Sequence, residues 1–302
     1  MKVVCLSGGV GGAKLARGLY DLVGADLTVV GNVGDDLEVF GLYVSPDLDS
    51  ILYALAGLND EERGWGRAGE TWRALESAKA LGADAWFQLG DLDLGLHLTR
   101  TDALRRGEPL SAVTRALADA AGLTATLLPA TDDRLRTHVV TRAGTLAFQD
   151  WFVARQHRDE VDELRYEGAG DATAAPGVLE AIEAADALVF APSNPFVSLL
   201  PILAVPAIRD AIAAREVRCV AVSPLIGGRS VKGPLDRMLT RMAGGTTPAH
   251  VAECYEGLLD ALVVDHADAP ADAAVQLVVT ATLMEDRKGS RRLAETVLEV
   301  AA

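Results

Sequence analysis

A short apolar segment runs directly into a glycine-rich turn at the start of the chain, and this junction limits the folds that the chain can adopt. Residues 1–6 read MKVVCL, which is typical of a buried strand, and residues 7–14 read SGGVGGAK. The apolar spacing of residues 13–22 predicts a helix directly after the turn. Because glycine has no Cβ and a helix N-terminus presents free amides, this combination predicts an anion site, usually for phosphate. The candidate phosphate-binding residues of the turn are Gly9, Gly11, Gly12 and Lys14.

The glycine run matches neither of the two common nucleotide-binding patterns. A dinucleotide fingerprint would have glycine at position 14, where this chain has Lys14. A P-loop needs glycine before the lysine and serine or threonine after it, and the chain has Ala13 and Leu15 there. The turn is therefore predicted to bind phosphate in the manner of another family.

Strand-like and helix-like segments alternate along most of the chain, which predicts a parallel sheet with helices on both faces. Further strands are expected at 27–30, 125–128, 137–140, 187–191, 217–222, 261–264 and 276–280, and a helix at 47–57. Helix-forming segments at 68–81, 101–106 and 111–121 dominate the region between the second and third strands. We therefore expect an α/β fold, a Rossmann-like doubly wound and mainly parallel sheet formed by 1–58 and 124–302, with a mainly helical insertion at 59–123.

Charge and composition exclude several classes of partner. The chain has 28 basic and 43 acidic residues, a formal net charge of -15, and no long basic run. This balance argues against a nucleic-acid or anionic-membrane surface, although salt-adapted organisms also have acidic protein surfaces. No apolar run reaches the roughly 18–20 residues that cross a bilayer, and the three cysteines have no paired spacing. We expect a cytoplasmic protein that binds neither membranes nor nucleic acid.

Two pairs of aspartates lie close behind the glycine turn in the sequence. Asp35 and Asp36 follow the second predicted strand, and Asp47 and Asp49 stand at the start of the next predicted helix. One interpretation is helix capping, a role that suits aspartate. The other is a magnesium site, since Mg²⁺ usually takes one or two carboxylates together with substrate phosphates. Capping explains one aspartate but not both pairs, so a carboxylate cluster at one cleft is a candidate.

Two later loops also follow predicted strands, where ligands bind in such sheets. The first, at 191–196, offers the side chains of Ser193 and Asn194, although a plain turn would have the same sequence. The second, at 223–234, brings Gly228, Arg229 and Lys232 to a strand end and is a candidate second phosphate or nucleotide site.

Taken together and in this order, these loops resemble one family along nearly the whole chain, the 2-phospho-L-lactate transferases that build coenzyme F-420. No single block is decisive, but nine blocks in register are specific. The matching blocks are SGGVGGAK at 7–14, NVGDD at 32–36, GLYVSPDLDSILYAL at 41–55, LGDLDL at 89–94, HLTRT at 97–101, ATDDRLRTHV at 130–139, FQDWFV at 148–153, APSNPFVSLLPIL at 191–203 and SPLIGGRSVKGP at 223–234.

The resemblance implies a magnesium-dependent phosphotransferase. Such an enzyme joins the ribityl 5′-hydroxyl of the deazaflavin FO to a phospholactyl-type or phosphoenolpyruvyl-type group and releases GMP. The donor is a lactyl- or enolpyruvyl-diphosphoguanosine, and the sequence does not distinguish the two. Phosphoryl transfer depends mainly on positioning and charge neutralisation, which glycine-loop amides and a carboxylate-held Mg²⁺ supply. We expect a homodimer.

The resemblance also implies roles for individual residues. Asp49 is expected to contact FO and, with Asp35, to act in catalysis, and Asp35, Asp36 and Asp49 are the expected metal ligands. The loops at 191–198 and 223–234 are expected to bind the guanosine diphosphate portion. Position 88 is usually basic in this family and touches FO. Here it is Gln88, which keeps a hydrogen-bonding group but not the charge.

Two other functions remain open at this point. A non-catalytic regulator that binds a nucleotide or nucleotide sugar would use the same sheet, since a fold does not determine a function. The second carboxylate pair, at 47–49, argues against that alternative because a sensor does not need it. An NAD-dependent oxidoreductase is disfavoured by Lys14 and by the absence of a ribose-binding acid in register.

Overall fold

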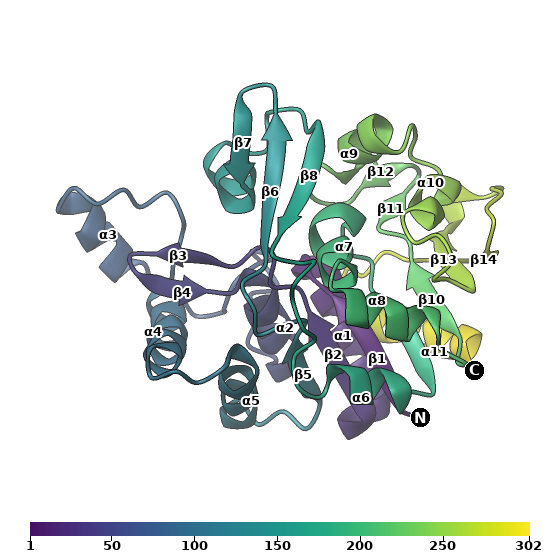
Figure 1. Ribbon diagram of the computed structural model, residues 1–302, viewed down its shortest axis with the longest axis horizontal. Helices are drawn as coiled ribbons and strands as arrows, with labels where there is room; N and C mark the ends of the chain where they lie inside the picture. Colours follow the sequence, from purple (N-terminus) through teal and green to yellow (C-terminus); the bar gives the residue numbers. More distant parts are fainter.

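A parallel sheet of seven strands forms the centre of the molecule (Figure 1). The computed structural model describes residues 1–302. The strands lie in the order β14-β13-β10-β9-β1-β2-β5, and all neighbouring pairs run parallel. Their bounds are β1 Val3–Ser7, β2 Leu27–Gly31, β5 Thr126–Pro129, β9 Ala187–Phe190, β10 Cys219–Val222, β13 Ala261–Asp265 and β14 Gln276–Thr280. The predicted α/β class with a doubly wound parallel sheet is confirmed.

The order of the strands reverses next to β1. From β1 the chain proceeds to β2 and β5 on one side, and later to β9, β10, β13 and β14 on the other. In open parallel sheets such a switch point leaves a crevice beyond the carboxyl ends of the strands, where ligands bind. The glycine turn that follows β1 lies at this crevice.

Helices cover both faces of the sheet. On one face α1 (Gly9–Val23) packs against α2 (Pro46–Ala56) and α11 (Arg287–Ala301), and on the other α6 (Val178–Glu183) packs against α8 (Pro206–Ala213). In Figure 1, α6 and α8 lie in front of the sheet and α1 and α11 behind it. Helix α1 begins inside the glycine run, earlier than its apolar spacing predicts, since glycines of the turn form its first residues.

The remaining elements are short or lie away from the sheet. The segment 59–123 holds the helices α3 (Arg73–Ala80), α4 (Asp91–Arg105) and α5 (Leu110–Ala120), and α5 packs on β5. The other elements are α7 (Leu200–Leu203), α9 (Leu235–Met242), α10 (Pro248–Glu253), the strand pair β11 (Leu225–Ile226) and β12 (Arg229–Ser230), and the 3₁₀ or π turns η1 (Gly24–Asp26), η2 (Asp150–Ala154), η3 (Pro195–Leu199) and η4 (His266–Asp268).

One predicted strand does not belong to the central sheet. Residues 137–140 lie in β6 (Arg136–Thr141), which pairs antiparallel with β7 (Gly144–Ala147) and β8 (Glu163–Glu167) in a separate sheet (Figure 1). The prediction of a parallel core strand there was wrong because β6 alternates buried and half-buried residues, a pattern of a one-sided sheet. A second hairpin, β3 (Leu37–Val39) and β4 (Leu42–Val44), was not predicted.

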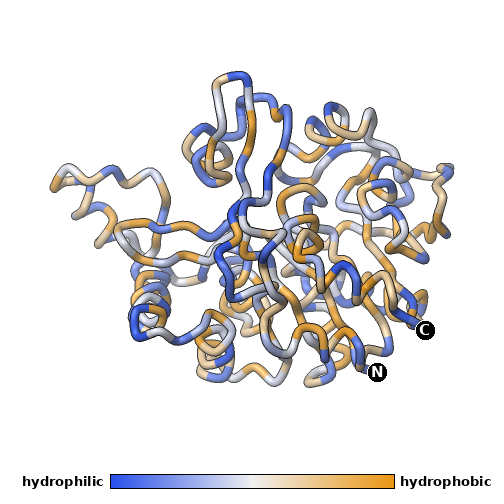
Figure 2. Tube along the Cα trace, viewed as in Figure 1, coloured by the Kyte–Doolittle hydropathy of each residue, from blue (hydrophilic) through white to orange (hydrophobic).

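Apolar residues concentrate along the central strands and on the helix faces that cover them (Figure 2). One contiguous cluster joins the two faces of the sheet and includes Cys5 and Cys219. Both thiols are fully buried, and all three cysteines are free. No single helix is long and apolar enough to span a membrane; a bent pair, Pro195–Leu203 with Pro206–Ala213, meets the criteria of length and composition alone.

Helices α1 and α11 approach closely at Gly18. A Cβ at this position would overlap the backbone carbonyl of Ser290 in α11. We expect Gly18→Ala to lower the free energy of unfolding by about 1–3 kcal/mol, measured by urea denaturation. The control Gly95→Ala, in α4 with open space around the new Cβ, should instead raise it by about 0.5–1 kcal/mol. An unchanged midpoint for Gly18→Ala would contradict this packing.

Candidate functional site

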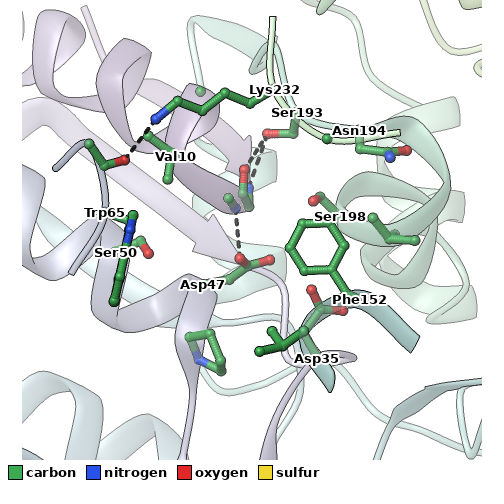
Figure 3. A pocket seen from close by; sticks show the side chains of 18 of the residues that line it. Val10, Asp35, Asp47, Ser50, Trp65, Phe152, Ser193, Asn194, Ser198 and Lys232 are labelled. Atoms are coloured by element: carbon green, nitrogen blue, oxygen red, sulfur yellow. Dashed lines mark hydrogen bonds between the residues drawn. The ribbon is translucent and has the colours of Figure 1, made fainter. Parts of the chain in front are cut away.

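A cavity of about 810 Å³ opens beyond the carboxyl ends of the central strands (Figure 3). Residues that follow β1, β2, β9, β10 and β14 line it, among them Gly8, Asp35, Ser193, Ser223 and Thr282. Other walls come from α2, from the segment 59–123 and from the turn after β7. The cavity therefore lies at the switch point of the sheet, as expected for a ligand site in this fold.

The glycine loop between β1 and α1 forms one wall of the cavity. The Ser193 hydroxyl donates to the Gly8 carbonyl at 2.7 Å and lies 3.2 Å from the Gly8 amide, which ties the loop after β9 to the loop after β1. A Cβ on Gly12 would overlap the hydroxyls of Ser7 and Ser193. Glycine is thus required here for close approach of two loops, and Gly12 itself does not line the cavity, whereas Gly9 and Gly11 do.

Two buried carboxylates lie beside this loop. Asp47 accepts hydrogen bonds from the Gly9 amide (2.7 Å) and from the Asn32 side chain (2.9 Å), and burial raises its pKa to about 6. Asp35 is also buried, and one of its oxygens, Oδ1, has no hydrogen-bond partner. Burial and then the negative charge of Asp47 raise the pKa of Asp35 well above its usual range. Figure 3 shows the two carboxylates facing the same part of the cavity.

This pair suits a hard divalent cation. Desolvation and mutual repulsion both disfavour two negative charges at this place, and a cation would relieve both. The free oxygen of Asp35 offers a ligand that no protein group uses. No group of three or more potential metal ligands is preformed. Mg²⁺ usually takes one or two carboxylates and completes its shell with water and phosphate.

Asp36, a predicted metal ligand, is turned away from the cavity. Its two oxygens accept hydrogen bonds from the Tyr43 hydroxyl at 2.7 Å and the Ser45 hydroxyl at 2.6 Å. Burial raises the pKa of Asp36 to about 7. It does not line the cavity, because the β3–β4 hairpin that the sequence did not reveal covers it. In this arrangement Asp36 anchors the hairpin.

Asp49 lines the cavity but is also paired. Arg100 of α4 contacts both of its carboxylate oxygens, and the two side chains are almost fully buried. His97, one turn earlier in α4, lies between Arg100 and the cavity. Burial lowers the pKa of His97 to about 4. Nothing in the sequence alone marks Arg100 or His97 as functional, although their spacing of three places both on one helix face.

Aromatic side chains form opposite parts of the cavity wall. Phe148 and Phe152 stack with their ring centres 5.2 Å apart and nearly parallel planes. Trp65 and Trp86 come from the segment 59–123, as does Gln88. The Arg63 guanidinium lies 5.0 Å from the ring centre of Trp65 and 5.1 Å from that of Trp72, which fixes the Trp65 loop. The cavity therefore offers flat apolar faces suited to a planar ring.

Two of the three predicted basic residues, Lys14 and Lys232, line the cavity. Lys14 lines the cavity and donates to the Met284 carbonyl at 2.7 Å. Burial and then the charge of Lys232 lower the pKa of Lys14. Lys232 also lines the cavity and donates to the Gly64 carbonyl at 3.2 Å (Figure 3).

Two of the predicted nucleotide-binding residues in the loop at 223–234 also lie outside the cavity. Gly228 donates its amide to Asp268 at 2.8 Å and borders a separate pocket of about 350 Å³. Arg229 is exposed and borders neither pocket. Asn194 does line the cavity, but its carbonyl oxygen caps the following turn by accepting from the Phe196 amide.

Comparison with known proteins assigns the chain to a family. The family described as "2-phospho-L-lactate transferase CofD" matches residues 3–297. The chain belongs to this family. It is therefore a transferase, and the family resemblance that the nine sequence blocks indicate is confirmed.

Relatives of the family are similar over their full length. Proteins named phosphoenolpyruvate transferase match from Streptomyces griseus (43% identical over 313 residues, 100% of this chain and 98% of the relative) and from Thermobifida fusca (42% identical over 317 residues, with the same coverage). Among solved structures, protein BH3568 from Bacillus halodurans has a TM-score of 0.66 at 18% identity and covers 98% of this chain and 99% of its own. At that identity the likeness shows the fold alone.

Proposed function

We propose that this transferase moves a phosphoenolpyruvyl- or phospholactyl-type group from a diphosphoguanosine donor to the ribityl 5′-hydroxyl of FO, in coenzyme F-420 biosynthesis. The observation that carries the proposal is one cavity that joins a glycine loop, the buried carboxylates Asp35 and Asp47, and flat aromatic walls. The proposed reaction requires a site that binds phosphate, a metal ion and a planar ring. The names of the curated relatives favour the phosphoenolpyruvyl-type donor.

In the proposed reaction the 5′-oxygen forms a bond to the distal phosphorus of the donor. The bond from that phosphorus to the bridging oxygen breaks, GMP leaves with the electron pair, and the hydroxyl proton passes to solvent. A bound Mg²⁺ would neutralise phosphate charge. We assign it to Asp35 and Asp47 in place of Asp36, which does not line the cavity, and Asp49, whose charge Arg100 neutralises.

The remaining cavity residues divide between the two substrates. The glycine loop at the start of α1 lies beside the carboxylates, where the diphosphate of the donor would bind. Its Gly8 and Gly9 amides hold the loop in place by donating to Ser193 and Asp47. Lys14 and Lys232 add positive charge to the same region. Asp49 and Gln88 lie with the aromatic residues of the segment 59–123, where FO would bind. This division would bring the acceptor hydroxyl and the phosphorus together in one cavity.

The proposal is tested by incubating the protein with FO, Mg²⁺ and each of three donors, with enolpyruvyl-, lactyl- or glyceryl-type acids. We expect GMP and a phosphodiester of FO in equal amounts, fastest with the enolpyruvyl donor, and no reaction when Mg²⁺ is chelated. If the protein binds guanine nucleotides but transfers no group from any donor, it is a nucleotide-binding regulator instead.

A further inference from the structure

Buried polar side chains connect helices α2 and α4. Asp49 and Tyr53 of α2, four residues apart, face Asp93, His97 and Arg100 of α4. All five side chains are buried, and the Tyr53 hydroxyl donates to Asp93 at 2.5 Å. Facing helix positions are normally apolar, since buried polar groups add little stability even when paired. This polar layer therefore points to a role other than holding the helices together.

Arg100 lies behind Asp49 as seen from the cavity. Its side chain is 2% exposed and does not line the cavity, while Asp49 does. One guanidinium nitrogen donates to Asp49 Oδ2 at 3.1 Å and the other contacts Oδ1, a bidentate arrangement that allows the carboxylate one orientation. Because Arg100 contacts both oxygens from behind, only their remaining lone pairs are available to a ligand. Asp49 thus enters the site as a hydrogen-bond acceptor of fixed direction.

Arg100 also determines the tautomer of His97. Its Nη1 lies 3.3 Å from His97 Nδ1, and a guanidinium can only donate hydrogen bonds. Nδ1 must therefore accept, and the proton of the neutral ring is on Nε2. No protein group accepts a hydrogen bond from Nε2, and His97 lines the cavity. The ring consequently offers an N–H donor to a ligand, beside the acceptor that Asp49 offers.

We infer that Arg100 is a positioning residue that holds Asp49 and His97 as a matched acceptor and donor for a hydroxyl group of the acceptor's polyol chain. A hydroxyl both donates and accepts, so one group between the two side chains satisfies both. The inference rests on the proposed function, because it takes a polyol-bearing acceptor as the substrate. In this arrangement the polar layer between α2 and α4 recognises the polyol chain of the acceptor rather than its ring.

The test compares Arg100→Lys, His97→Gln and His97→Phe by steady-state kinetics with both substrates varied. Lysine keeps the charge but loses the bidentate contact, so Arg100→Lys should raise the KM for FO about tenfold or more and leave the KM for the donor unchanged. His97→Phe should have a similar effect, and His97→Gln, which retains a donor, a smaller one. Arg105→Lys is the matched control, because Arg105 is on the same helix, at its outer end, and contacts only the Gly41 carbonyl; it should behave as wild type.

An FO analogue whose chain keeps only the reacting hydroxyl distinguishes positioning from a structural role. With this analogue the wild type should already have a raised KM, and Arg100→Lys should add little to it. The inference is wrong, and Arg100 is structural, if Arg100→Lys raises the KM for FO and the KM for the donor alike. The same holds if it raises the KM for FO and the KM for the analogue by the same factor. If Arg100→Lys does not fold, the two His97 variants give the same test. If the wild type itself does not use FO, the proposed function fails, and that result is separate.

Discussion

Asp35→Asn is expected to slow the transfer reaction about 1000-fold or more, equivalent to roughly 4 kcal/mol of transition-state stabilisation. Asparagine has the same shape but lacks the charge that would hold Mg²⁺ against the donor phosphates. The Mg²⁺ concentration at half-maximal rate should rise in the same variant. Stability should not fall, because burial and Asp47 raise the pKa of Asp35 and so disfavour its charged form in the fold at neutral pH. Initial rates against Mg²⁺ concentration, with thermal melts, measure all three quantities.

Asp36→Asn is the matched comparison. The neighbouring carboxylate is equally buried but accepts hydrogen bonds from Tyr43 and Ser45 and does not face the cavity. Its replacement should lower the melting temperature, since one of two donors loses its acceptor, and should reduce the rate far less than Asp35→Asn, with no change in the Mg²⁺ requirement. The reverse pattern would assign the metal to Asp36 and contradict the arrangement proposed here.

The location of the site can be predicted from the sequence, whereas the hydrogen-bond partners of its side chains cannot. Loops that follow parallel strands meet at one edge of the sheet, so the glycine turn, Asp35 and Ser193 are brought together by topology alone. The partner of Asp49 is Arg100, 51 residues further along the chain. No local pattern pairs these two residues, because the contact depends on how the segment 59–123 folds back on α2. A buried polar face on α4 is visible only after that packing is known.

Two groups of predicted site residues lie outside the cavity for the same physical reason. Asp36 follows a strand like Asp35, but adjacent residues point in different directions, and the short β3–β4 hairpin decides which one the cavity receives. Gly228 and Arg229 share a loop with Lys232, but this loop forms the small strand pair β11–β12, so that only part of it faces the cavity. The sequence therefore predicts which loops reach the cavity, but the local turn within each loop determines which of its residues face it.

Gly8→Ala is expected to reduce activity about 100-fold or more by displacing Asp47, a loss of roughly 3 kcal/mol. Gly8 has an extended backbone (φ -158, ψ 161) that any residue adopts, so the new methyl group causes no backbone strain. Its Cβ would instead stand 2.5 Å from Asp47 Oδ2 and 2.7 Å from Ser198 Cβ. Asp47 would then lose its 2.7 Å hydrogen bond to the Gly9 amide, and the metal-binding pair and the phosphate-binding loop would move apart.

The size of this effect separates a local displacement from general destabilisation. Overpacking at one position costs typically 1–3 kcal/mol of stability, which leaves most of the protein folded at 25 °C. Melting curves should therefore show a folded Gly8→Ala variant whose rate is low and whose Mg²⁺ requirement is raised. Gly170→Ala, where a new Cβ meets nothing within 4 Å, should match the wild type in both measurements. If Gly8→Ala keeps its full rate, Asp47 has no part in binding the metal or the phosphate, and Asp35 alone would have to provide the protein's contribution to the metal site.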